Sequence, residues 1–171
     1  MHSIHLKLVL TGGLLIAALA VPAAAQTYGD SLKPQARART FSATLTGTHE
    51  VPQVNTIGSG SAKFTVKNDS TIVFDLSLKG VPDVTGAHIH LGAAGTAGAA
   101  VATLIQGADP GGKVSGTITP MDLHGATMSQ LIAAMKSGGA YVNVHTKTHP
   151  DGEVRGEIQP AASTTVSQLV H

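Results

Sequence analysis

The stretch that decides the fold is residues 61–80, which read SAKFTVKNDSTIVFDLSLKG. Apolar residues alternate with polar ones in both halves of this stretch, and Asn68-Asp69 stands between the halves as a turn. A period of two places every second side chain on one face of a β-strand. The stretch therefore predicts a hairpin of two antiparallel strands, with one face in a core and the other in water.

The same alternation recurs on both sides of this hairpin, in short segments separated by Gly, Pro, Asn and Asp. We predict eight strands, over residues 41–47, 61–67, 71–80, 84–92, 100–106, 113–119, 140–146 and 153–159. Residues 127–139 differ, because their apolar residues recur at helical spacing before Gly138-Gly139 and so indicate a short helix. The pattern predicts an all-β fold, a Greek-key β-sandwich or barrel of about eight strands with one short helix across one end.

The N-terminal residues 1–25 have the three parts of a secretory signal peptide. Lys7 precedes an apolar run over residues 8–21, and Ala23-Ala24-Ala25 offers a cleavage site before Gln26. The apolar run is shorter than the about 20 residues of a comfortable membrane span, although a single anchoring helix is the alternative. We therefore predict a periplasmic or secreted protein with no membrane span once the signal peptide is removed.

The rest of the chain is of single-domain length, and its composition limits the partners. We expect a linker over residues 26–38, one domain over 39–160 and a loosely held tail over 161–171. Eleven Lys and Arg face ten Asp and Glu, and Lys7 leaves with the signal peptide, so the domain is close to neutral. With no basic stripe and no Trp, binding to nucleic acid is not indicated. The absence of cysteine excludes disulfides, thiolate chemistry and a Cys-ligated metal.

Two histidines stand one residue apart in GAHIHLG, residues 86–92. Alternation turns Ala87 and Ile89 inward, so His88 and His90 share the outer face. Positions i and i+2 of a strand lie about 6.5–7 Å apart, and two imidazoles at that distance can converge on Cu(II), Zn(II) or Ni(II). Two ligands alone bind a metal weakly, so a site needs a third.

His145 is the candidate for the third ligand, because Val142 and Val144 would turn inward and leave it on the outer face of residues 140–146. His49 and His149 lie in expected loops and are candidates for a fourth ligand. The alternative is that His88 and His90 are only polar residues on the wet side of a sheet. Either interpretation is compatible with the spacing.

Other catalytic patterns are missing from the sequence. It contains no G-x-S-x-G elbow and no Gly-rich phosphate loop that leads into a helix. Residues 92–100, GAAGTAGAA, indicate a flexible loop between strands. Glu153 and Glu157 fall on the outer alternation of the last strand, which predicts a solvated face.

Three motifs together resemble the CHRD domain, over about residues 40–160. They are FSATLTGTHEVP from Phe41, GAHIHLGAAG from Gly86 and YVNVHTKTHPDGEVRGEI from Tyr141. The resemblance implies an immunoglobulin-like β-barrel, distantly similar to copper/zinc superoxide dismutases, in a family without an established biochemical role. The family usually has glutamine where this chain has His49, which makes that histidine a feature of this protein.

The dismutase comparison implies roles for four residues. His88 and His90 match the copper-binding pair, His145 could match a late histidine, and Arg155 could match the arginine that guides the anion. No histidine lies between His90 and Gly116, so the bridging histidine and the zinc site have no counterpart. Arg155 also has a structural interpretation as a bracket paired with a neighbouring glutamate, which we rank ahead of the anion guide.

Two hypotheses about function follow. The first is an exported, non-catalytic β-sandwich module that binds an unidentified protein partner or forms part of the envelope. The second is a mononuclear copper- or zinc-binding protein with His88, His90 and His145 as ligands and His49 as a further candidate. Superoxide-dismutase-like redox chemistry at that metal is a weaker extension of the second hypothesis.

Overall fold

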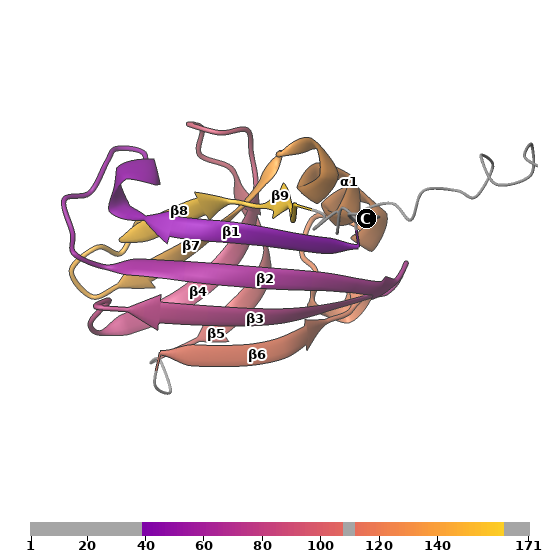
Figure 1. The fold of residues 1–171 in the computed structure, drawn as a ribbon, viewed down its shortest axis with the longest axis horizontal. Coiled ribbons are helices and arrows are strands. Elements are labelled where there is room, and N and C mark those ends of the chain that lie inside the picture. The colour runs from indigo at the N-terminus through magenta and orange to yellow at the C-terminus, as the bar shows by residue number, and fades with distance from the viewer. Residues whose placement is uncertain (1–38, 108–111, 163–171) are drawn as a thin grey trace, which may run out of the picture. The chain divides into compact units, whose positions relative to one another are not determined.

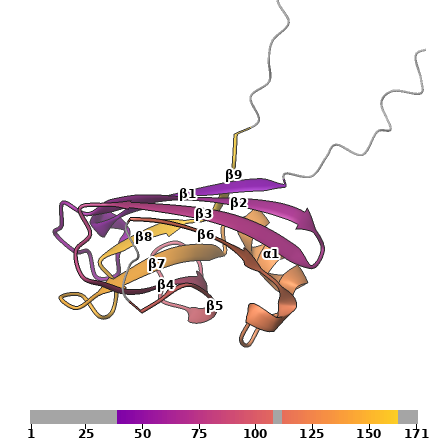
Figure 2. The same ribbon diagram turned by 90° about the horizontal axis from the view of Figure 1, so that it is seen from below.

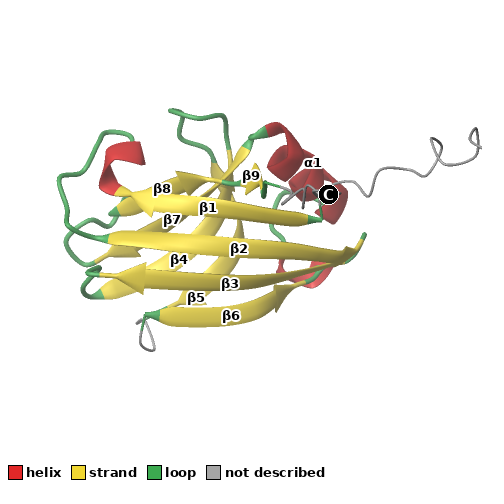
Figure 3. Ribbon diagram, viewed as in Figure 1, coloured by secondary structure: helices red, strands yellow, loops and turns green. Residues whose placement is uncertain are grey.

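The computed structural model describes residues 39–107 and 112–162. Its strands are β1 (Thr40–Thr46), β2 (Ser59–Asn68), β3 (Thr71–Lys79), β4 (Val84–Leu91), β5 (Ala99–Gln106), β6 (Lys113–Ile118), β7 (Ala140–Thr146), β8 (Val154–Glu157) and β9 (Gln159–Pro160). Its helices are the 3-10 turns η1 (Gly47–His49) and η2 (Pro120–Asp122) and the α-helix α1 (Met128–Ser137), as Figure 3 shows. All eight predicted strand segments are found, and the last is divided into β8 and the short β9.

The strands form an antiparallel sheet in the order β5-β4-β7-β8-β1-β2-β3-β6, with β9 paired to β1. This sheet curls so that β1, β2, β3 and β6 form one layer and β4, β5 and β7 the other (Figures 1 and 2). β5 approaches β6 without a ladder between them, so the barrel is nearly closed. If the order is continued from β5 to β6 across this gap, the four strands β7-β4-β5-β6 form a Greek key. The all-β prediction is confirmed.

The hairpin of β2 and β3 supplies much of the core. Phe64 pairs with Phe74 and Ala62 with Leu76, and all four side chains are buried. Their polar neighbours turn outward, as the alternation requires. The core is therefore the space between the two layers, filled by every second residue of each strand.

The helix α1 covers one end of the barrel (Figure 2). Thr127 caps its first turn by accepting the backbone N–H of Gln130, and Gly138 ends it in the left-handed conformation at φ 73°. Leu131 and Met135 are fully buried in the core. The predicted short helix is confirmed, including its stop at the paired glycines.

Several expectations concern parts of the chain that are not described. The predicted signal peptide, the linker and most of the tail fall outside the described residues. Within the described ranges, no helix has the length and apolar character that a bilayer crossing requires.

Candidate metal centre

The strands that carry the predicted ligands are neighbours in the barrel wall. β4 and β7 pair antiparallel, in a register that sets Gly86 opposite His145, two positions from His88. The alternate residues of both strands are completely buried in the core: Ala87, Ile89, Val142 and Val144. The histidines of β4 and β7 therefore point to the outside of the wall, as predicted.

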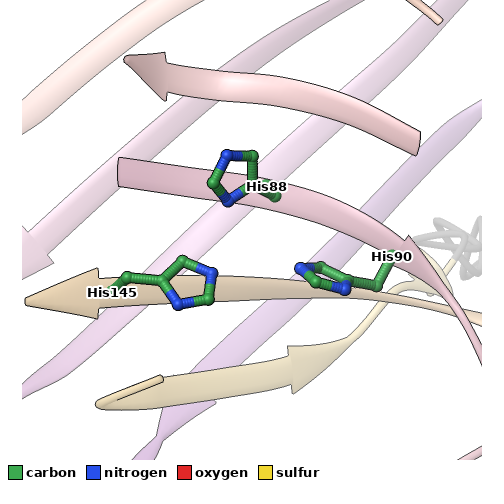
Figure 4. Close-up of side chains that lie close together, drawn as sticks. All are labelled: His88, His90 and His145. Carbon is green, nitrogen blue, oxygen red and sulfur yellow. The ribbon is translucent and has the colours of Figure 1, made fainter. Parts of the chain in front are cut away.

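His88, His90 and His145 lie together on this outer face (Figure 4). One ring nitrogen from each lies within 4.8 Å of the other two. The ring centroids are 5.1 Å apart for His88 and His145, 6.0 Å for His88 and His90, and 6.1 Å for His90 and His145. Nitrogens that share one ion at about 2.0–2.1 Å lie about 3–4 Å from one another, so ring shifts of about an ångström are enough for a common ion.

Backbone carbonyls fix the proton position in two of the rings. His90 Nδ1 lies 2.9 Å from the carbonyl oxygen of Gly98, and His145 Nδ1 lies 2.9 Å from that of Pro150. A carbonyl oxygen only accepts hydrogen bonds, so both Nδ1 atoms carry the proton. In a neutral ring this leaves the Nε2 lone pair for a metal, which is the arrangement found behind many metal-binding histidines.

His90 Nε2 is the most informative atom of the group. It is buried, and it has no hydrogen-bond partner among the described residues. Burial is also the main cause that lowers the pKa of both His88 and His90 from 6.5, and the charge of His145 adds to it. These surroundings therefore favour neutral imidazoles, which is the form that binds metal ions.

Two glycines make room for this arrangement, and the pattern of the sequence indicated a role for neither. A Cβ at Gly86 would lie 3.3 Å from Cε1 of His88, so the ring of His88 rests over the bare backbone there. A Cβ at Gly98 would collide with the carbonyl oxygen of Leu91, so only glycine fits where a carbonyl reaches His90. The feature of the sequence that could have indicated this space is the glycine two residues before the H-x-H pair.

Arg155 is turned away from the core, as predicted, but it is not exposed. Only 2% of it is accessible, because residues 92–98 cover it. Its Nη1 donates to the carbonyl oxygen of Thr96 at 2.8 Å, and its Nη2 lies 3.7 Å from Glu157. Its guanidinium carbon lies 3.5 Å from the ring centroid of Tyr141. These contacts favour the structural bracket over the anion guide.

The solvated face predicted for Glu153 and Glu157 is wrong for Glu153. That side chain is 3% exposed and accepts a hydrogen bond from Thr56 Oγ1 at 2.8 Å. The alternation was correct, but the segment after β1 folds over the outer side of β8 and buries it. The alternation within one strand does not show whether a distant segment of the chain will cover its outer face.

Glu50 belongs to the same covering segment and is a buried acid, 6% exposed. Burial raises its pKa from 4.5 to about 7, although the charge of Arg155 and the backbone N–H of Val51 act in the opposite direction. Its Oε1 and the Oδ1 of Asn143 both lack a hydrogen-bond partner among the described residues. Both oxygens face the space above Gly152, where a Cβ would lie 2.7 Å and 2.5 Å from them.

The two histidines considered as fourth ligands lie outside the group of three. His49 is about half exposed, and its Nδ1 is 3.8 Å from Glu157 Oε2. His149 borders a pocket with Pro52 and Pro150. The described part of the chain thus brings together three side chains that could hold a metal ion.

Fold and site together define a β-barrel module with a histidine cluster on the outside of its wall. The sequence pattern of the CHRD domain matches residues 41–158. The chain therefore belongs to the CHRD domain family, as its motifs indicated. A comparison with curated proteins finds no match. The expected likeness to copper/zinc superoxide dismutases stays a prediction.

Proposed function

We propose that this protein is an exported CHRD module that binds one transition-metal ion, copper or zinc, through His88, His90 and His145. The observation that carries the proposal is the convergence of three imidazoles whose ligand atoms lie within 4.8 Å of one another. The Nε2 of His90 supports it, because this atom is buried without a hydrogen-bond partner in the described parts of the chain, and a bound ion would satisfy it.

The donor set indicates which metals would bind. Three imidazole nitrogens without thiolate suit Cu(II) and Zn(II), and Cu(II) binds such sites more tightly than Zn(II) does. Three protein ligands also leave room for a water or another exogenous ligand. A protein that only binds the metal needs no further catalytic residue. Arg155 donates its hydrogen bonds to residues 92–98, and this gives no support to a role in guiding an anion to the metal.

Calorimetry on the metal-free protein at neutral pH tests the proposal. We expect one Cu(II) per chain with submicromolar affinity. His88→Ala or His145→Ala should raise the Kd for Cu(II) at least tenfold, about 1.4 kcal/mol, because each removes one of the three imidazoles and leaves two. His49→Ala is the matched control and should bind like the wild type. Absence of saturable one-to-one binding, or an effect of His49→Ala as large as that of His88→Ala, would refute the three-histidine site.

Export is the second part of the proposal, and residues 1–25 support it through their charged start, apolar run and small-residue cleavage site. We expect the mature protein to begin at Gln26 and to appear in the periplasmic or culture fraction. Mass spectrometry of the protein purified from its own host measures both the new N-terminus and any bound metal. An intact N-terminus in the cytoplasmic fraction would contradict export and leave the metal site open to its own test.

A further inference from the structure

One residue of the loop over the site contacts both His90 and a tyrosine. The carbonyl oxygen of Gly98 accepts the Nδ1 proton of His90 at 2.9 Å, and the backbone N–H of Gly98 donates to the hydroxyl oxygen of Tyr141 at 3.0 Å. Tyr141 is 2% exposed. Its hydroxyl is therefore linked to His90 through the two polar groups of a single residue.

The same tyrosine also supports the imidazole directly. The rings of His90 and Tyr141 are stacked, with centroids 4.9 Å apart and planes inclined by 15°. The two residues are opposite each other in the pairing of β4 with β7. The stack limits the tilt of the imidazole, and the hydrogen bond through Gly98 limits its rotation about the Cβ–Cγ bond.

Residues 92–98, which include the Gly98 that contacts His90, are also held by Arg155. Arg155 donates to the carbonyl oxygens of Thr96 and Ala93, at 2.8 Å and 3.4 Å. Gly98 lies too close to the carbonyl oxygen of Leu91 for any side chain. The carbonyl that fixes His90 thus belongs to a loop with a defined position, although the sequence alone suggested a flexible one.

We propose that Tyr141 is a positioning residue of the metal site. Its hydroxyl fixes Gly98, and Gly98 keeps the proton of His90 on Nδ1 and the Nε2 lone pair directed at the ion. This inference rests on the proposed metal function. It deepens that function, because a hydroxyl that touches no metal then sets how tightly the metal is held.

Tyr141→Phe tests the proposal with little other disturbance. It removes the hydroxyl and keeps the ring, and with it the stack on His90 and the contact with Arg155. Loss of an outer partner of a metal ligand typically weakens metal affinity 10- to 100-fold, and we expect an increase in the Kd for Cu(II) of about tenfold. Thr96→Ala is the matched control, because its hydroxyl donates only within the loop, to Ala93.

A second readout needs no metal. Nitrogen-15 NMR of the metal-free protein, above the pKa of His90, reports which ring nitrogen carries the proton. We expect Nδ1–H alone in the wild type and in Thr96→Ala, and a detectable fraction of Nε2–H in Tyr141→Phe. A folding defect would instead change the dispersion of the whole spectrum, which the same sample reports.

The outcomes separate the two proposals. If the wild type binds no Cu(II) or Zn(II), the proposed function fails, and the NMR experiment alone decides whether Tyr141 positions His90. If the wild type binds metal and Tyr141→Phe binds it equally well with His90 still only Nδ1–H, the positioning role is refuted. Equal losses in Tyr141→Phe and Thr96→Ala would also refute it, because the hydroxyl of Tyr141 would then have no specific part.

Discussion

Replacing Glu50 by glutamine should remove a pH dependence from the stability of this barrel. Glu50 Oε1 and Asn143 Oδ1 are both buried acceptors without a hydrogen-bond partner in the described parts of the chain, and both face Gly152. A proton on Glu50 turns one of these acceptors into a donor. The amide of glutamine carries donors at every pH, so Glu50→Gln should keep the protonated arrangement throughout.

The size and sign of the effect follow from the pKa of Glu50, which burial raises from 4.5 to about 7. The folded state then binds this proton more tightly than the unfolded state does. The stabilisation is complete below pH 4.5 and is lost as the pH rises through 7. The shift corresponds to at most about 3.5 kcal/mol, since each pKa unit is worth about 1.4 kcal/mol.

Other groups titrate in the same range with the opposite sign. The pKa values of His88 and His90 are lowered from 6.5 in the folded protein, so their contribution to stability increases as the pH rises towards 6.5. These histidines are present in both proteins. The difference in free energy of unfolding between Glu50→Gln and the wild type therefore isolates Glu50.

Urea unfolding of both proteins, with a metal chelator and at intervals from about pH 4.5 to 8.5, measures this difference. We expect Glu50→Gln to gain on the wild type by about 1–3 kcal/mol as the pH rises from 4.5 to 7, with no further gain above pH 7. Parallel curves for the two proteins would refute the assignment of a raised pKa to Glu50. A gain confined to pH below 5 would refute it as well.

Three further substitutions test the packing, each by denaturant unfolding or hydrogen exchange. Gly156→Ala would place a Cβ against the backbone carbonyl of Thr44, and the separation of β8 from β1 should cost about 1–3 kcal/mol. Leu131→Ala opens a cavity where α1 closes the barrel and should cost about 2–5 kcal/mol. Arg155→Met removes two hydrogen bonds to residues 92–98 and should speed hydrogen exchange at the amide of Gly98. Unchanged stability or exchange in any of these would contradict the contact concerned.

Much of the fold could be predicted because it depends on local pattern. The alternation around Phe64 and Phe74 and the helical spacing before Gly138 are properties of neighbouring residues. The outward direction of His88, His90 and His145 is local too, since it follows from their position in a strand. That β4 and β7 would be adjacent did not follow from the pattern of either strand, so the alternation could name His145 as a candidate without showing that it lies beside His88.

The pattern of the strands did not indicate that two loops would cover part of the outer face of the barrel. Asn143, Glu153 and Arg155 have the periodicity of solvent-facing residues and are nevertheless buried. The segments that cover them, residues 47–58 and 92–98, have no regular period, so their path depends on tertiary contacts. The role of the glycines at 86 and 98 was hidden for the same reason, because a missing side chain matters only once its neighbour is known.

The proposed metal site and the core share strands but no side chains. On β4, Ala87 and Ile89 are buried in the barrel, whereas His88 and His90 point out of its wall. Ligands can thus be exchanged without changing the packing that keeps the barrel folded. If the proposed site holds a metal, His88→Asp or His88→Cys should fold as before and differ in which ion it selects, because the wall of the barrel carries the ligands and the core carries the packing.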